Sequence, residues 1–145
     1  MSKKIWEFNF KKQINCSKEV AFWNYWDHEH LDVVHDGYSK SDIMYDRKEF
    51  MFRVDVVKLP LLGFLKPLTP IFTVQHDENT MITYAIQFGV LSKTTIKINS
   101  LSQKKCEINM NYKFYLNREK IGSVIFNEKD LLNSINFLME NKLKY

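Results

Sequence analysis

The stretch that decides the fold class is Cys106-Glu107-Ile108-Asn109-Met110-Asn111-Tyr112-Lys113-Phe114-Tyr115. Its even-numbered positions are apolar or aromatic, and its odd-numbered positions as far as Lys113 are polar. Alternation with a period of two is typical of a strand that buries one face and leaves the other in solvent. This run therefore predicts a long, half-buried β-strand.

Similar runs in the rest of the chain predict six more strands. They span Ile5–Ile14, Ile43–Tyr45, Phe50–Val57, Ile71–Gln75, Thr80–Gly89 and Thr94–Leu101. Short polar segments separate the later runs and predict turns at Asp77-Glu78-Asn79, Leu91-Ser92-Lys93 and Ser102-Gln103-Lys104. Because short connections are typical of antiparallel hairpins, we expect about seven strands in one curved antiparallel sheet.

Two segments outside these runs predict helices. Ser17 is a good N-cap for a helix that begins at Lys18 and ends near Gly37, with a bend that makes it two short helices. Asn127 caps a long C-terminal helix that continues to about Leu143. The expected fold class is α+β, with the curved sheet wrapped around the C-terminal helix and a deep apolar cavity between them.

The composition narrows the function classes. The 145 residues fit a single domain, 1–145, and 45% of them are hydrophobic, so a sizeable core is available. Only three of the 21 cations are Arg and the lysines are scattered, so we expect no nucleic-acid partner. The sequence has neither a signal-peptide-like apolar run nor a stretch as long as a membrane span. Cys16 and Cys106 have no partner motif, which fits a reduced, cytoplasmic chain.

The predicted order of elements is one strand, a helix pair, six strands and a long helix. This order resembles the helix-grip fold of the START-like (SRPBCC, Bet v 1-like) superfamily. The resemblance implies a domain that encloses a small hydrophobic molecule, with aromatic compounds among the candidates. The strand pattern predicts a set of cavity residues, each of which plain core packing also explains: Phe52, Val54, Tyr84, Phe88, Ile98, Met110, Tyr112 and Phe114.

The densest concentration of ionisable groups is Asn24–Gly37, which contains three of the four histidines. On a helix, Asp27 and His30 share a face. His30 and His35 lie about 140° apart on a regular helix, so they converge on one ion only if the helix bends or ends between them. Two imidazoles and a carboxylate form non-haem iron centres, and imidazole also suits zinc. The stretch predicts a mononuclear Fe(II) or Zn site, with a polar patch at the cavity mouth as the alternative.

The spacing Asn24-x2-Asp27-x2-His30-x4-His35 resembles the mononuclear iron motif in the catalytic domain of Rieske-type aromatic-ring-hydroxylating oxygenases. The resemblance implies that His30 and His35 are metal ligands. It also implies that Asp27 is the neighbouring carboxylate that orients His30, a role that such carboxylates have at many metal sites.

The same resemblance implies a third ligand in the C-terminal helix, for which Asp130 is the first choice and Glu128 the second. A capping role explains Asp130 equally well. No Cys-x-His…Cys-x-x-His pair is present, so the chain has no Rieske cluster, and oxygenation would need a separate redox partner. Two functions stay open: a hydrophobic-ligand-binding domain with a metal site, or a metal-dependent oxygenase-like or hydrolytic enzyme.

Overall fold

The computed structural model describes residues 4–27, 39–57, 68–87 and 90–116. These residues form seven strands and one α-helix. In chain order, the elements are β1 (Lys4–Ile14), α1 (Lys18–Trp26), β2 (Ser39–Arg47), β3 (Phe50–Val57), β4 (Leu68–Gln75), β5 (Thr80–Gln87), β6 (Val90–Ser102) and β7 (Lys105–Leu116). Within the described ranges, no helix is long and apolar enough to cross a membrane.

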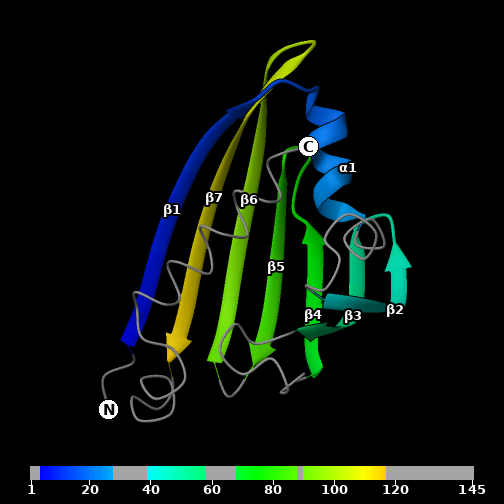
Figure 1. Cartoon of the computed structure of the whole chain (residues 1–145), viewed down its shortest axis with the longest axis vertical. Helices are drawn as coiled ribbons and strands as arrows, with labels where there is room; N and C mark the ends of the chain where they lie inside the picture. The colour runs from blue at the N-terminus through cyan, green and yellow to red at the C-terminus, as the bar shows by residue number, and fades with distance from the viewer. Residues whose placement is uncertain (1–3, 28–38, 58–67, 88–89, 117–145) are drawn as a thin grey trace.

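The seven strands form one sheet in the order β1-β7-β6-β5-β4-β3-β2, and every neighbouring pair is antiparallel. Figure 1 shows the strands side by side, with α1 beginning at the end of the sheet where β1 finishes. The prediction of one seven-stranded antiparallel sheet is confirmed. Strands from β2 to β7 follow each other as neighbours, whereas β1 pairs with β7, the last described strand.

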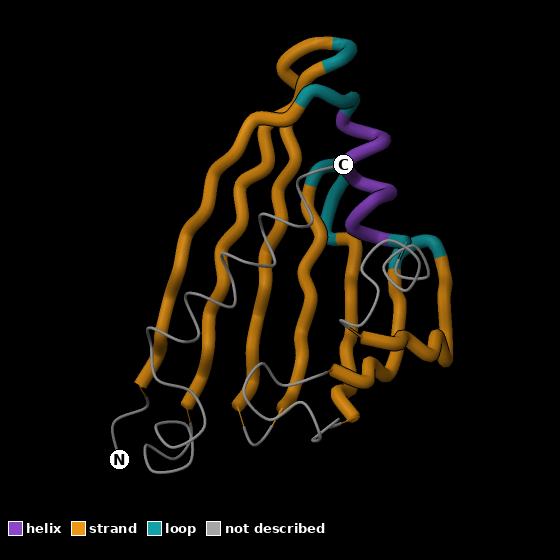
Figure 2. Tube along the Cα trace, viewed as in Figure 1, coloured by secondary structure: helices purple, strands orange, loops and turns teal. Residues whose placement is uncertain are grey.

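The predicted α+β class is wrong for the described part of the chain. That part is mostly sheet, its one helix has nine residues, and it contains no long C-terminal helix (Figure 2). The predicted helix pair and C-terminal helix extend into residues 28–38 and 117–145, which lie outside the described residues. Within the described residues, helix therefore makes up a smaller share than the predicted class implies.

The helix predicted to run from Lys18 toward Gly37 begins as expected and ends early. Ser17 caps it by accepting the Val20 N–H at 3.3 Å. The helix ends at Trp26, and Asp27 takes an extended backbone with φ −76° and ψ 97°. Residues 24–27 all have low helix propensity, which favours the end of the helix at Trp26.

Several strands are longer than predicted. The predicted turn at 91–93 is wrong, because Ser92 and Lys93 pair with Ala85 and Tyr84 in the ladder between β6 and β5. Likewise, β4 begins at Leu68, three residues before the predicted start of this strand at Ile71.

The register divides the strand side chains between two faces of the sheet. We call the face that packs against α1 the inner face. It carries Met81, Ile96 and Met110, which are paired across β5, β6 and β7 and pack with Ala21 and Tyr25 of α1. Because side chains alternate along each strand, the register assigns every described strand residue to the inner or the outer face.

The core lies between α1 and the inner face of β5 to β7. Ala21 and Tyr25 are four residues apart and therefore share one side of the helix. They pack in the cluster that contains Ile98, Cys106 and Ile108, whose exposed fractions are 0%. Burying a side chain the size of Ile contributes about 1.5–3 kcal/mol, so this cluster holds α1 on the sheet.

Candidate functional site on the inner face of the sheet

A cluster of polar side chains lies on the inner face where β2, β3, β4 and β5 are neighbours. We call it the polar cluster, and its members are Ser41, Arg53, Asp55, Thr73 and Thr83. The register pairs Ser41 with Asp55 and Thr73 with Thr83. These strands thus bring together five polar residues from four separate segments of the chain.

Arg53 is the main donor of the polar cluster. Its Nε–H donates to both carboxylate oxygens of Asp55, with N···O distances of 3.1 and 3.3 Å. Its Nη1 donates to Thr73 Oγ1 at 3.1 Å, and the Thr73 and Thr83 hydroxyl oxygens lie 3.1 Å apart. Ser41 Oγ donates to Asp55 Oδ1 at 2.7 Å. The five side chains form one continuous hydrogen-bond network.

The ion pair of this network is buried, with exposed fractions of 4% for Arg53 and 6% for Asp55. Moving two charges out of water costs several kcal/mol per ion, which their attraction and hydrogen bonds only partly offset. Thr69 is the residue of β4 opposite Asp55. It is also buried, and its Oγ1 has no hydrogen-bond partner within the described part of the chain. The inner face therefore offers a hydroxyl group that can take one further hydrogen bond.

Apolar side chains surround the polar cluster on the same face. Met51 precedes Arg53 by two residues, Ile71 lies opposite Arg53, and Met81 precedes Thr83 by two residues. All three apolar side chains are at most 7% exposed. The inner face thus combines a wide apolar surface with one localised group of hydrogen-bonding side chains.

The outer face of the same strands carries aromatic rings. Phe52 and Phe72 are stacked, with ring centroids 4.6 Å apart and an interplanar angle of 19°. Phe50 extends this contact at 6.2 Å from Phe72, and Tyr45 lies 5.9 Å from Phe50. Phe72 and Tyr45 are 37% and 43% exposed. Strands β2 to β4 therefore bury charges on one side and expose aromatic rings on the other.

The predicted cavity residues divide between the two faces. The members on the inner face are Ile98, Met110, Tyr112 and Phe114. The members on the outer face are Phe52, Val54 and Tyr84. Phe88 lies outside the described residues. The structure therefore brings four of the eight predicted residues together on the face that contacts α1.

Among the predicted metal-site residues, Asp27 alone lies in the described ranges. It is the C-cap of α1, where its N–H donates to the Trp23 carbonyl at 2.7 Å. The other predicted ligands lie outside the described residues: His30, His35, Asp130 and the alternative Glu128. The described ranges contain no group of three or more His, Cys, Asp or Glu side chains that could hold a metal ion.

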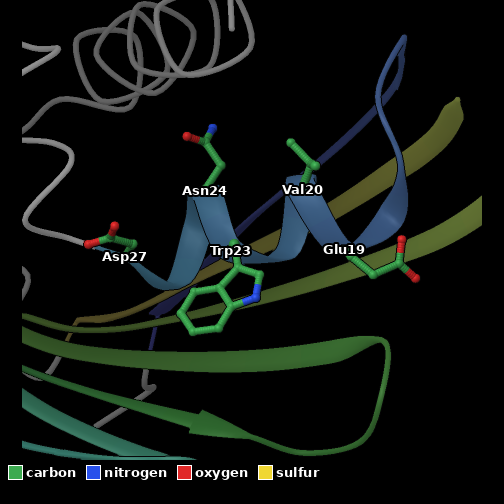
Figure 3. A pocket seen from close by; sticks show the side chains of 5 residues that line it. All are labelled: Glu19, Val20, Trp23, Asn24 and Asp27. Carbon is green, nitrogen blue, oxygen red and sulfur yellow. The ribbon is translucent and has the colours of Figure 1, made fainter.

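Asp27 also lines an open pocket of about 330 Å³ on the surface of α1. Figure 3 shows Glu19 and Asp27 at the two ends of this pocket, with Trp23 between them. Trp23 is 65% exposed. The described residues that line the pocket all come from α1 and its C-cap, so this surface lacks the several converging strands that build the polar cluster.

The structure also places the two cysteines together, which the sequence did not predict. Cys16 follows β1, and it packs against the core cluster that contains Cys106 of β7. The pKa of the Cys106 thiol is raised to about 11, chiefly by burial and then by the nearby Cys16 thiol. Burial also raises the pKa of the Tyr25 hydroxyl, and Tyr112 and both cysteines contribute to this shift.

Solved structures share this architecture. Norcoclaurine synthase from Thalictrum flavum aligns over 99% of this chain and 95% of its own, at 14% identity with a TM-score of 0.73. A START superfamily protein from Mycobacterium smegmatis aligns over 93% and 92%, at 12% identity and a TM-score of 0.70. An aromatase/cyclase from a Streptomyces species aligns over 96% and 87%, at 6% identity and a TM-score of 0.67. The chain has a START-like fold.

The START-like fold agrees with the resemblance seen in the order of elements. No family model matches the sequence, and no curated protein matches it significantly. The structural neighbours are START and Bet v 1-like proteins, and those compared above include no Rieske-type oxygenase. At these identities the likeness shows the fold alone, so the function must be argued from the residues of this chain.

Proposed function

We propose that this START-like domain binds a small hydrophobic molecule on the inner face of its sheet. The ligand has an apolar body and at least one oxygen-bearing group that meets the polar cluster. The structural neighbours support the first part, since one of them, norcoclaurine synthase, has been solved in complex with dopamine and hydroxybenzaldehyde. Both of those ligands are small aromatic molecules with polar substituents.

The observation that carries the proposal is the buried ion pair of Arg53 and Asp55 on an otherwise apolar face. Apolar residues of similar volume are often equally or more stabilising than a buried ion pair, so packing gives no reason for these charges. Binding sites for small molecules are mostly apolar and carry a few placed polar groups that fix the orientation of the ligand. The polar cluster, with the Thr69 hydroxyl beside it, fits that description.

A pair of adjacent residues on β5 allows a matched test. Ala85 lies on the inner face opposite Ile71, whereas Ile86 lies on the outer face and is 50% exposed. The fluorescent probe 8-anilinonaphthalene-1-sulfonate has an apolar ring system and an oxygen-bearing end. We expect Ala85→Phe to fill the inner face and weaken binding of this probe by at least about tenfold, a change of roughly 1.4 kcal/mol. Ile86→Phe should leave the affinity unchanged.

Titration of the folded proteins, followed by probe fluorescence, measures both affinities. Circular dichroism and urea unfolding of each variant confirm that the fold is retained. Equal affinities in wild type and Ala85→Phe, or loss of binding only in Ile86→Phe, would contradict the proposal and place the probe elsewhere.

The predicted metal centre is a separate proposal, supported by the spacing of His30 and His35 in the sequence. Purified protein reconstituted with Fe(II) or Zn(II) should hold close to one ion per chain. The double substitution His30→Ala with His35→Ala should remove it, as measured by elemental analysis after dialysis. A wild-type protein that retains no metal under these conditions refutes the metal centre and leaves the ligand-binding proposal untouched.

A further inference from the structure

The two cysteines of the chain are 90 positions apart in sequence, yet both belong to one corner of the core. Cys106 of β7 lies opposite Ile14 of β1 in the ladder between these strands, and Cys16 follows Ile14 by two residues. Ile14 and Cys16 both pack against the cluster that contains Cys106. Cys16 is also close enough to Cys106 to contribute to the raised pKa of the Cys106 thiol. The described structure holds them as free thiols.

We propose that Cys16 and Cys106 form a redox-active pair that closes to an intramolecular disulfide under mild oxidation. The geometry supports this because Ile14 lies opposite Cys106 in the ladder, and Cys16, two residues further on, packs against the same cluster. Side-chain rotations that bring the two sulfur atoms to the S–S bond length of about 2.05 Å would then close the bond. The inference is independent of the proposed ligand, since neither cysteine belongs to the polar cluster.

The two thiols differ in access, and this difference sets the order of events. Cys106 is 0% exposed, whereas Cys16 is only partly buried. An oxidant therefore reaches the Cys16 sulfur first. The raised pKa of the Cys106 thiol keeps it protonated near neutral pH, so it does not react with the oxidant first. Its place beside Cys16 makes it the second, resolving thiol.

With hydrogen peroxide as the oxidant, the reaction has two steps. The Cys16 thiolate attacks one peroxide oxygen, the O–O bond breaks, and Cys16 becomes a sulfenic acid while hydroxide leaves. The Cys106 sulfur then attacks the Cys16 sulfur, the S–O bond breaks, and the Cys106 proton leaves with the oxygen as water. In total, two thiols lose two electrons and two protons, and one peroxide becomes two waters.

The disulfide would join the turn before α1 to the first residues of β7. It closes a loop of 91 residues, counted from Cys16 to Cys106 inclusive. A loop of this length strongly restricts the unfolded chain, so we expect the oxidised protein to melt roughly 10 °C higher than the reduced one. Tyr25 belongs to the same cluster, so the new bond also fixes the surroundings of the buried face of α1.

Treatment of the full-length protein with a small excess of hydrogen peroxide tests the pair. Intact-mass measurement should show a loss of two hydrogen atoms, thiol titration should fall from two groups to none, and dithiothreitol should restore both. Proteolysis without reduction should release one peptide pair joined through Cys16 and Cys106.

Two variants separate this reaction from other oxidation. In Cys106→Ser, the same treatment should leave Cys16 with one or more added oxygen atoms or joined to a second chain. In Cys16→Ser, the buried Cys106 should stay reduced. The proposal is overturned if wild-type protein gains oxygen atoms like Cys106→Ser, or if its disulfide joins two chains. The wild-type peptide map decides the question even if either variant fails to fold.

Discussion

The two halves of the sheet distribute their side chains in opposite ways. In β1, β7 and β6, the inner face is mostly apolar and the outer face carries charges such as the Lys113–Glu7 ion pair, with N···O 3.5 Å. In β3 and β4, the inner face buries the Arg53–Asp55 ion pair, and the outer face carries the stacked rings of Phe52 and Phe72. Only the first half has apolar side chains on the covered face and polar side chains on the solvent face, the arrangement that burial of apolar surface alone favours.

One row of the register shows the change directly. On the outer face, Phe52 pairs with Phe72, Phe72 with Tyr84, Tyr84 with Lys93, and Lys93 with Lys113. The row passes from aromatic to cationic between β5 and β6, where Lys93 Nζ lies 5.8 Å from the centre of the Tyr84 ring. The reversal teaches that core packing explains the first half of the sheet, whereas the second half carries a composition that core packing does not explain and that the proposed binding role would explain.

The largest expected effect comes from breaking the buried ion pair. Asp55→Ala leaves the Arg53 guanidinium buried without its carboxylate, so we expect a loss of about 3–5 kcal/mol in the free energy of unfolding. Urea denaturation measures it. The double variant Arg53→Met with Asp55→Leu removes both charges and should recover most or all of that loss.

Glu7→Ala provides the matched control in the other half of the sheet. It also breaks an ion pair, but the side chains of Glu7 and Lys113 are 45% and 37% exposed, and solvent-exposed pairs contribute little. If Asp55→Ala lost no more stability than Glu7→Ala, the buried and the exposed ion pair would contribute equally. The proposed difference between the two halves of the sheet would then be wrong.

Raising the pH should lower the free energy of unfolding by a smaller amount, through the Cys106 thiol in the half of the sheet formed by β1, β7 and β6. Burial holds the pKa of the Cys106 thiol at about 11, above its ordinary value of 9.0, and also raises the pKa of Tyr25. Because the pKa of this thiol is higher in the folded state than in the unfolded chain, the buried, protonated thiol makes its full contribution to stability below pH 9. The contribution is then lost as the pH rises toward 11, because the unfolded chain ionises first. We expect a loss on the order of 1–2 kcal/mol from Cys106.

Urea unfolding under reducing conditions at pH 7, 9, 10 and 11 measures this loss. Cys106→Ala should show a shallower fall between pH 9 and 11 than the wild type, with the remaining decline above pH 10 attributable to Tyr25. Identical pH profiles for the two proteins would mean that the Cys106 thiol titrates in the folded state as it does in the unfolded chain.

Much of the sheet was predictable because period-two alternation depends on the local sequence alone. The run around Met110 and the cap at Ser17 both have the predicted structure. The face that each strand buries was not predictable in the same way. In β3, Met51, Arg53 and Asp55 alternate with Phe50, Phe52 and Val54, and hydrophobicity favours the wrong set as the inner one.

The polar cluster and the cysteine pair escaped prediction for a related reason. Both form through register between strands that are distant in sequence, such as Thr73 with Thr83 and Ile14 with Cys106. A single sequence contains no signal for such pairings. The sequence of β3 offers one local sign of the polar cluster. Arg53 alternates with Phe52, so one face of this strand must combine a charged residue with apolar neighbours, which local patterning alone does not favour.

The pairing of β1 with β7 has a consequence for how the chain folds as it is made. Asn9 and Asn111 hydrogen-bond across this ladder although they are 102 residues apart in sequence. Ribosomes add about 5–20 residues per second, so β1 waits roughly 5–20 s for its only described neighbour. During that interval, its stripe of Trp6, Phe8 and Phe10 has no sheet to join. The first of the described strands to be synthesised is therefore among the last to pair, and its aromatic stripe stays open to aggregation until β7 has been made.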